Sequence, residues 1–125
     1  MGNIMSRNLF DLHSNPEQLH GYPKILVRIP EIALRLAYKK KDKAFREILE
    51  VAIAKTPHTA YEYASKVIKG RFPAGESMIA KDSLLAYQYA VDVINDKFPA
   101  GEEAINKNPF LKWMYSKQRF NKAKK

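Results

Sequence analysis

A block of 26 residues recurs along the chain, and this repeat limits the folds that the chain can adopt. The sequence Tyr-Glu-Tyr-Ala at 61–64 returns as Tyr-Gln-Tyr-Ala at 87–90, and Phe-Pro-Ala-Gly-Glu at 72–76 returns unchanged at 98–102. Repeats of about 20–50 residues are typical of arrays in which each copy forms one supersecondary unit. The sequence therefore predicts a row of similar units.

Further copies lie on both sides of this pair. Ile-Ala-Lys at 53–55 stands one repeat before Ile-Ala-Lys at 79–81, and residues 30–37 align with 57–64 at an offset of 27. The first copy has Arg46 where the later copies have Phe72 and Phe98, so the pattern of its second helix is incomplete. We place the units near 30–56, 57–82 and 83–108, with a partial copy at 109–115.

Each unit is expected to form two helices. In the first helix, apolar residues such as Tyr63 and Val67 follow one another at spacings of three and four, which predicts a wide apolar face. A residue that can cap a helix precedes each first helix; these residues are Thr56, Asp82 and Asn108. We expect Gly70 and Asp96 to end the helix, because both residue types accept a left-handed turn.

The second helix is short and opens at Phe72-Pro73, with Glu76 near its positive end and Met78 and Ile79 on its buried side. A unit of this size cannot bury its own apolar face, so neighbouring units must stack. We therefore predict an all-α fold of stacked helix-turn-helix repeats, a short α-solenoid-like single domain. Residues 1–29 would form a non-repeat N-terminal cap and residues 116–125 a basic tail, in one folding unit.

The repeat pattern Ala-Tyr-x-Tyr-Ala-x-x-Val-Ile, followed by Phe-Pro-Ala-Gly-Glu-x-x-Ile, resembles short tandem repeats of proteins from tailed bacteriophages and other large DNA viruses. The likeness covers residues 30–115. It implies a viral source, and because that group has no common activity it implies little about the task of the chain.

Positive charge is concentrated near the C-terminus. The net charge is +9. The segment from residue 111 onward contains six basic residues and no acidic residue, whereas residues 59–110 contain six basic and seven acidic residues. Clustered Lys and Arg neutralise phosphates without choosing a sequence, and Trp113, Tyr115 and Phe120 are interleaved with these bases. The candidate binding residues are Lys39, Lys40, Lys41, Lys43, Arg46, Lys112, Lys117, Arg119, Lys122, Lys124 and Lys125.

Catalytic chemistry is not indicated. The chain has no cysteine, and its three histidines, His13, His20 and His58, lack the spacing of metal ligands. Glu50, Glu76 and Glu102 recur once per unit, but a helix-end charge paired with Arg71 or Lys97 explains them better than acid–base work. Tyr61, Tyr63, Tyr87 and Tyr89 could stack on bases, although packing between units fits their spacing better. We expect no enzyme activity, metal or cofactor.

The function that these features favour is a non-enzymatic viral binding module that contacts an anionic partner, either nucleic acid or an acidic protein. The competing prediction is a protein–protein inhibitor or structural subunit that uses the faces of the stacked helices. No stretch reaches the roughly 20 apolar residues of a membrane span, which favours the cytoplasm of a host cell. Residues 1–6 match the N-myristoylation pattern at Gly2, a minor alternative that would place the protein on a membrane.

Overall fold

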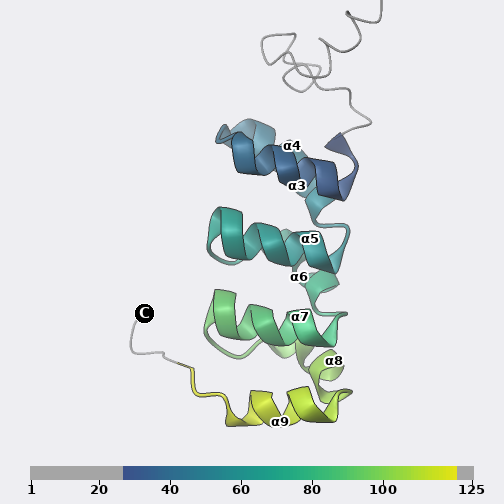
Figure 1. Cartoon of the computed structure of the whole chain (residues 1–125), viewed down its shortest axis with the longest axis vertical. Helices are drawn as coiled ribbons and strands as arrows, with labels where there is room; N and C mark the ends of the chain where they lie inside the picture. The colour runs from purple at the N-terminus through teal and green to yellow at the C-terminus, as the bar shows by residue number, and fades with distance from the viewer. Residues whose placement is uncertain (1–26, 121–125) are drawn as a thin grey trace, which may run out of the picture. The chain divides into compact units, whose positions relative to one another are not determined.

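The computed structural model describes residues 27–120, and every regular element in this range is a helix (Figure 1). The predicted all-α fold is thereby confirmed. The chain divides into two compact parts, residues 1–53 and 54–125, which are described separately below. Most of the proposed cap at 1–29 lies outside the described residues. Of its positions from 27 to 29, which are described, Val27 is buried.

The N-terminal part contains two helices that pack against each other, α3 (Pro30–Lys39) and α4 (Lys43–Ile53). The second helix of the first copy is therefore present, although Arg46 replaces the phenylalanine of the later copies. Asp42 starts this helix instead, because its Oδ2 accepts a hydrogen bond of 3.1 Å from the N–H of Phe45. The Phe45 ring is buried one residue before the position of Arg46.

The C-terminal part holds two complete units and the opening of a third. In each unit the first helix begins as an α-helix and closes with a π-helical turn, and a short second helix follows after a loop. The elements are α5 (Pro57–Glu62), η2 (Tyr63–Ile68), α6 (Pro73–Ile79), α7 (Ser83–Gln88), η3 (Tyr89–Ile94), η4 (Pro99–Gly101), α8 (Glu102–Asn106) and α9 (Pro109–Lys117).

The predicted helix starts are confirmed at all three positions. The side chains of Thr56 and Asp82 accept hydrogen bonds from the N–H groups three residues later, and Asn108 accepts from the N–H groups of Phe110 and Leu111. These bonds occupy donors that a helix leaves without an internal partner in its first turn. Each unit is thus given a defined starting point by its own sequence.

The predicted helix ends were wrong by one residue. Lys69 and Asn95, not Gly70 and Asp96, have the left-handed backbone, with φ of 60° and 56°. The N–H of Lys69 or Asn95 makes the last π-helical bond, to the carbonyl of Ala64 or Ala90, and the N–H of the following residue bonds to the same carbonyl at 3.0 or 3.2 Å. The left-handed residue is therefore Lys69 in the first unit and Asn95 in the second. Asparagine is less strained than lysine in this conformation.

Two glycines allow the second helix of each unit to lie directly on the first. A Cβ atom on Gly75 would stand 2.7 Å from the Cβ of Ala60 and 2.7 Å from the Phe72 ring. The same atom on Gly101 would stand 2.8 Å from the Cβ of Ala86. The Gly of the Phe-Pro-Ala-Gly-Glu block is therefore required by close packing within the unit.

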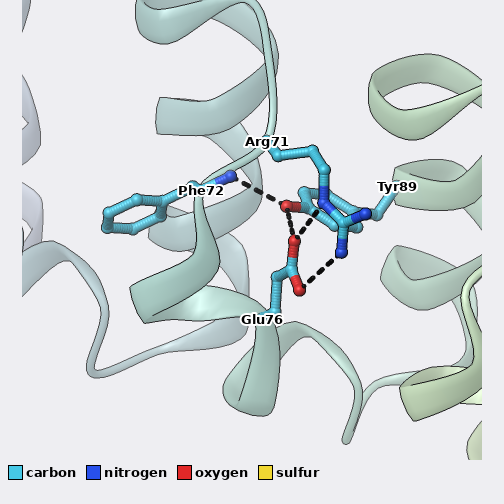
Figure 2. Close-up of polar contacts among 4 residues, drawn as sticks. All are labelled: Arg71, Phe72, Glu76 and Tyr89. Carbon is cyan, nitrogen blue, oxygen red and sulfur yellow. Dashed lines mark hydrogen bonds and ion pairs between the residues drawn. The ribbon is translucent and has the colours of Figure 1, made fainter.

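A tyrosine from each following unit joins the two units at the loop before the second helix. At the first of these junctions, Tyr89 donates its hydroxyl hydrogen to Glu76 (2.7 Å) and accepts a hydrogen bond from the N–H of Phe72 (2.9 Å) (Figure 2). Arg71 completes this junction with two hydrogen bonds of 2.9 Å to the Glu76 carboxylate. The first junction is defined by Arg71, Phe72, Glu76 and Tyr89.

The second junction lies one repeat later and is defined by Lys97, Phe98, Glu102 and Tyr115. The hydroxyl of Tyr115 accepts from the N–H of Phe98 (2.8 Å) and donates to Glu102 (2.8 Å). The Nζ of Lys97 lies 5.3 Å from the centroid of the Tyr115 ring. The recurring tyrosine and glutamate thus have a shared structural role between units, as the sequence predicted for Tyr89.

The junctions shift the proton affinities of their members. Burial, together with the hydrogen bond to Glu102, raises the pKa of Tyr115 to about 12, and burial likewise raises the pKa of Tyr89. Burial alone would raise the pKa of Glu76, but hydrogen bonds from Arg71 and Tyr89 outweigh it, so the pKa of Glu76 is lowered. These shifts favour the neutral hydroxyl of Tyr89 and Tyr115 and the ionised carboxylate of Glu76.

Candidate binding surface

Helix α9 follows the same pattern as α7 but carries polar residues where α7 is buried. Ala86 of α7 and Ala90 of η3 are fully buried, and Ala86 faces Gly101 of its own unit. The residues one repeat later are Lys112 and Ser116, and both are exposed. A helix whose buried alanines are replaced in this way can present that face to solvent at little cost.

Two aromatic side chains are strongly exposed on α9. Phe110 is 65% exposed and Trp113 is 58% exposed. They are three residues apart, and Lys117 follows Trp113 by four, so the three side chains share one face of the helix. Large aromatic residues so far exposed are uncommon on a surface that has no binding task.

The charged residues of α9 itself and of the chain that follows it are all positive. No acid follows Glu103 in the sequence, and Lys112, Lys117 and Arg119 are all exposed. No ion pair of these three bases is found among residues 27–120. We call Phe110, Lys112, Trp113, Lys117 and Arg119 the α9 surface.

The start of the basic tail is held against the helices. Tyr87 donates a hydrogen bond of 3.3 Å to the side chain of Gln118, and the ring of Phe120 lies 6.3 Å from that of Tyr115. These contacts set the chain direction on either side of Arg119. The remaining predicted bases of the tail, Lys122, Lys124 and Lys125, lie outside the described residues.

The other predicted cluster lies in the N-terminal part, around the loop between α3 and α4. Lys39, Lys41 and Lys43 are exposed, whereas Lys40 and Arg46 are half-buried. Lys39 occupies the last turn of α3, where a base also stabilises the helix end. Among the described residues, the single exposed aromatic side chain beside this cluster is Tyr38 of α3, which is 42% exposed, so the cluster lacks the aromatic pair found on α9.

The remaining residues that the sequence singled out take part in hydrogen bonds and packing within the fold. Glu76 and Glu102 belong to the junctions, and the predicted pairing of Glu76 with Arg71 is confirmed. Tyr63 and Tyr89 are buried, and each packs edge-on or tilted against the phenylalanine of its unit. Within the part of the chain that the structure describes, no group of three or more His, Asp or Glu side chains is placed to hold a metal ion.

Sequence reasoning did not select Phe110 as a binding residue. The signal was available in the repeat register, because His58 and Leu84 occupy the same position and both are exposed. An aromatic residue at a position that is exposed in two other copies stands out only after the copies have been aligned. Exposure at this position is therefore a property of the unit, and the aromatic side chain is specific to α9.

Comparisons with protein-family models, with curated proteins and with solved structures find no match to this chain. The likeness to bacteriophage repeats stays a prediction. Across residues 27–120, none of the helices has the length and apolar character needed to cross a lipid bilayer.

Proposed function

We propose that this chain is a non-enzymatic binding module that holds single-stranded nucleic acid on the α9 surface. The observation that carries the proposal is the pair of exposed aromatic side chains, Phe110 and Trp113, on one face of a helix whose own charged residues, Lys112 and Lys117, are both positive. Proteins that bind single strands combine these two elements, because bases stack on aromatic rings while Lys and Arg neutralise the phosphates.

An acidic protein is the other partner class that the positive charge would attract. Two features favour the nucleic acid. Every nucleobase has a face that can stack on Trp113 or Phe110, whereas the carboxylates of an acidic peptide cannot stack on these rings. The bases Lys112, Lys117 and Arg119 are exposed and spread along the helix and the chain after it, which suits a partner with regularly spaced phosphates.

The test uses the intrinsic fluorescence of Trp113, which is the only tryptophan of the chain. Full-length protein is titrated with oligothymidylate longer than the roughly 4–16 nucleotides that one single-strand site covers. We expect quenching of Trp113, with an affinity that falls steeply as salt is raised. A parallel titration with polyglutamate represents the acidic polypeptide.

Two variants separate stacking from charge. Trp113→Ala should weaken binding, measured by anisotropy of a labelled oligonucleotide, by about 1–3 kcal/mol, whereas Trp113→Tyr should retain most of it. Replacing Lys112 and Lys117 by alanine should lower the salt slope, and the control variant K66A/K69N removes two positive charges elsewhere. Tighter binding of polyglutamate than of oligothymidylate, or no quenching by either, would overturn the proposal.

A further inference from the structure

One exposed lysine recurs three times at the repeat spacing of 26 residues. Lys55, Lys81 and Lys107 occupy the same position, in the turn that joins a second helix to the next first helix. All three are exposed. Among the described residues, the side chains of these three lysines make no hydrogen bond or ion pair.

Packing does not explain why this residue type is kept. The isoleucine two positions earlier, Ile79 or Ile105, is fully buried, so its recurrence follows from the core. Other exposed positions change between copies, as Lys66 and Asp92 do. A base near the end of a helix adds modest stability by its interaction with the helix dipole, and arginine would do this equally well.

A groove of about 510 Å³ connects two of these lysines. Its walls come from α6 and from the second helix of the next unit, and its small side chains are Ala80, Ala100 and Ala104. The charged residues that line the groove are Lys81, Lys107 and Glu103, two positive and one negative. The groove therefore gives an anionic chain an open path from one lysine to the next.

This path leads into the α9 surface. Phe110 follows Lys107 by three residues, across the turn capped by Asn108, so the last lysine of the row adjoins the first exposed ring of α9. We infer that the strand bound by α9 continues along the groove, with its phosphates at Lys107 and Lys81 and then toward Lys55. This inference rests on the proposed function and adds a direction and a length to it.

The experiment measures oligothymidylate binding by the full chain and by the double variant K81A/K107A at several salt concentrations. Each lost phosphate contact should reduce the slope of log affinity against log salt by about 0.7, so the double variant should lose about 1.4. Its affinity at low salt should fall at least tenfold. The matched control is K66A/K69N, since both residues lie at the opposite end of the first helix and asparagine suits the left-handed turn of position 69.

The length of the oligonucleotide supplies a second measurement. For the wild type, affinity should continue to rise with length after the α9 surface is filled, and K81A/K107A should remove this additional rise. Thermal unfolding of both double variants shows whether either has lost its fold.

Equal losses in K81A/K107A and K66A/K69N, or no loss in either, would overturn the lysine path even if Trp113→Ala still abolishes binding. The proposed function itself fails in a different way, because then the wild type does not bind the oligonucleotide at all.

Discussion

At the first junction Arg71 holds Glu76 through two hydrogen bonds, whereas at the second junction Lys97 lies over the ring of Tyr115. The inner parts of the two junctions agree closely. The tyrosine hydroxyl stands 2.9 Å from the N–H of Phe72 in one and 2.8 Å from that of Phe98 in the other. The distances from the same hydroxyl to the glutamate are 2.7 and 2.8 Å.

The difference shows which half of a junction is fixed by the fold. The N–H of the phenylalanine is buried and must have an acceptor, so the tyrosine hydroxyl and its glutamate recur. The basic residue at the rim of each junction is exposed. Arg71 makes hydrogen bonds to the glutamate, whereas Lys97 lies over the tyrosine ring. Variation between copies is tolerated at the rim and is restricted inside.

The largest expected effects come from the close contacts of Gly75 and Gly101, which both copies share. Gly75→Ala and Gly101→Ala each place a Cβ within 3.0 Å of an alanine and a phenylalanine, so each should lower the free energy of unfolding by about 2–3 kcal/mol, as overpacking typically does. Denaturant unfolding measures the loss. Ser77→Ala, at an exposed position of α6, is the control; a tolerated G75A would contradict the close approach.

Removing the tyrosine hydroxyl should have the next largest effect. Tyr89→Phe and Tyr115→Phe each leave a buried N–H without its acceptor, which costs about 1–3 kcal/mol. Tyr89→Phe should cost more, because Tyr89 is completely buried and Tyr115 is 6% exposed. Tyr87→Phe, which removes only the weaker bond to Gln118, should cost least. If the three variants had equal stability, the junctions would not join the units.

Acid should weaken the first junction through Glu76. Its pKa is lowered in the folded protein, so near that pKa the unfolded chain binds more protons than the folded one. The stability that Glu76 contributes is therefore fully present above the ordinary glutamate pKa of about 4.5. It is lost as the pH falls through the lower pKa of Glu76 in the folded protein. Urea unfolding between pH 7 and pH 3 should show a smaller acid loss for Glu76→Gln than for the wild type. Glu103→Gln, at an exposed position, should follow the wild type.

The smallest effect is expected at the left-handed residues. Lys69→Asn should stabilise the protein by a few tenths of a kcal/mol, because asparagine tolerates φ of 60° better than lysine does. Asn95→Lys should destabilise it by a similar amount. Thermal unfolding of the two variants, measured in parallel, should show shifts of opposite sign. Shifts of the same sign would mean that the charge of the lysine outweighs the backbone strain.

Local features of the fold were predictable from the sequence because they depend on neighbouring residues. The helix starts at Thr56, Asp82 and Asn108 follow from short-range capping, and the all-α fold follows from the repeat and its apolar spacing. The position of the left-handed turn was missed by one residue, because it depends on the long hydrogen bond from Gly70 back to Ala64. Sequence spacing does not reveal that bond.

The contacts of the two junctions were only partly predictable. The pair of Arg71 with Glu76 was expected from their short separation. The bond from the Phe72 N–H to the Tyr89 hydroxyl joins residues 17 positions apart and needs the packed units to exist. The same limit applies to the candidate site. Lys112, Lys117 and Arg119 were selected by charge, whereas the exposure of Phe110 becomes apparent only from the exposure of His58 and Leu84 at the same position of the repeat.

The short reach of the junctions along the chain has a consequence for how the protein forms. Each junction joins residues only 13 to 17 positions apart, so a new unit needs only its immediate predecessor as a template. Chains rich in such local contacts fold quickly. During synthesis, the loop before α6 can be completed as soon as Tyr89 of η3 has left the ribosome, and the repeats can be added one at a time in the order in which they are translated.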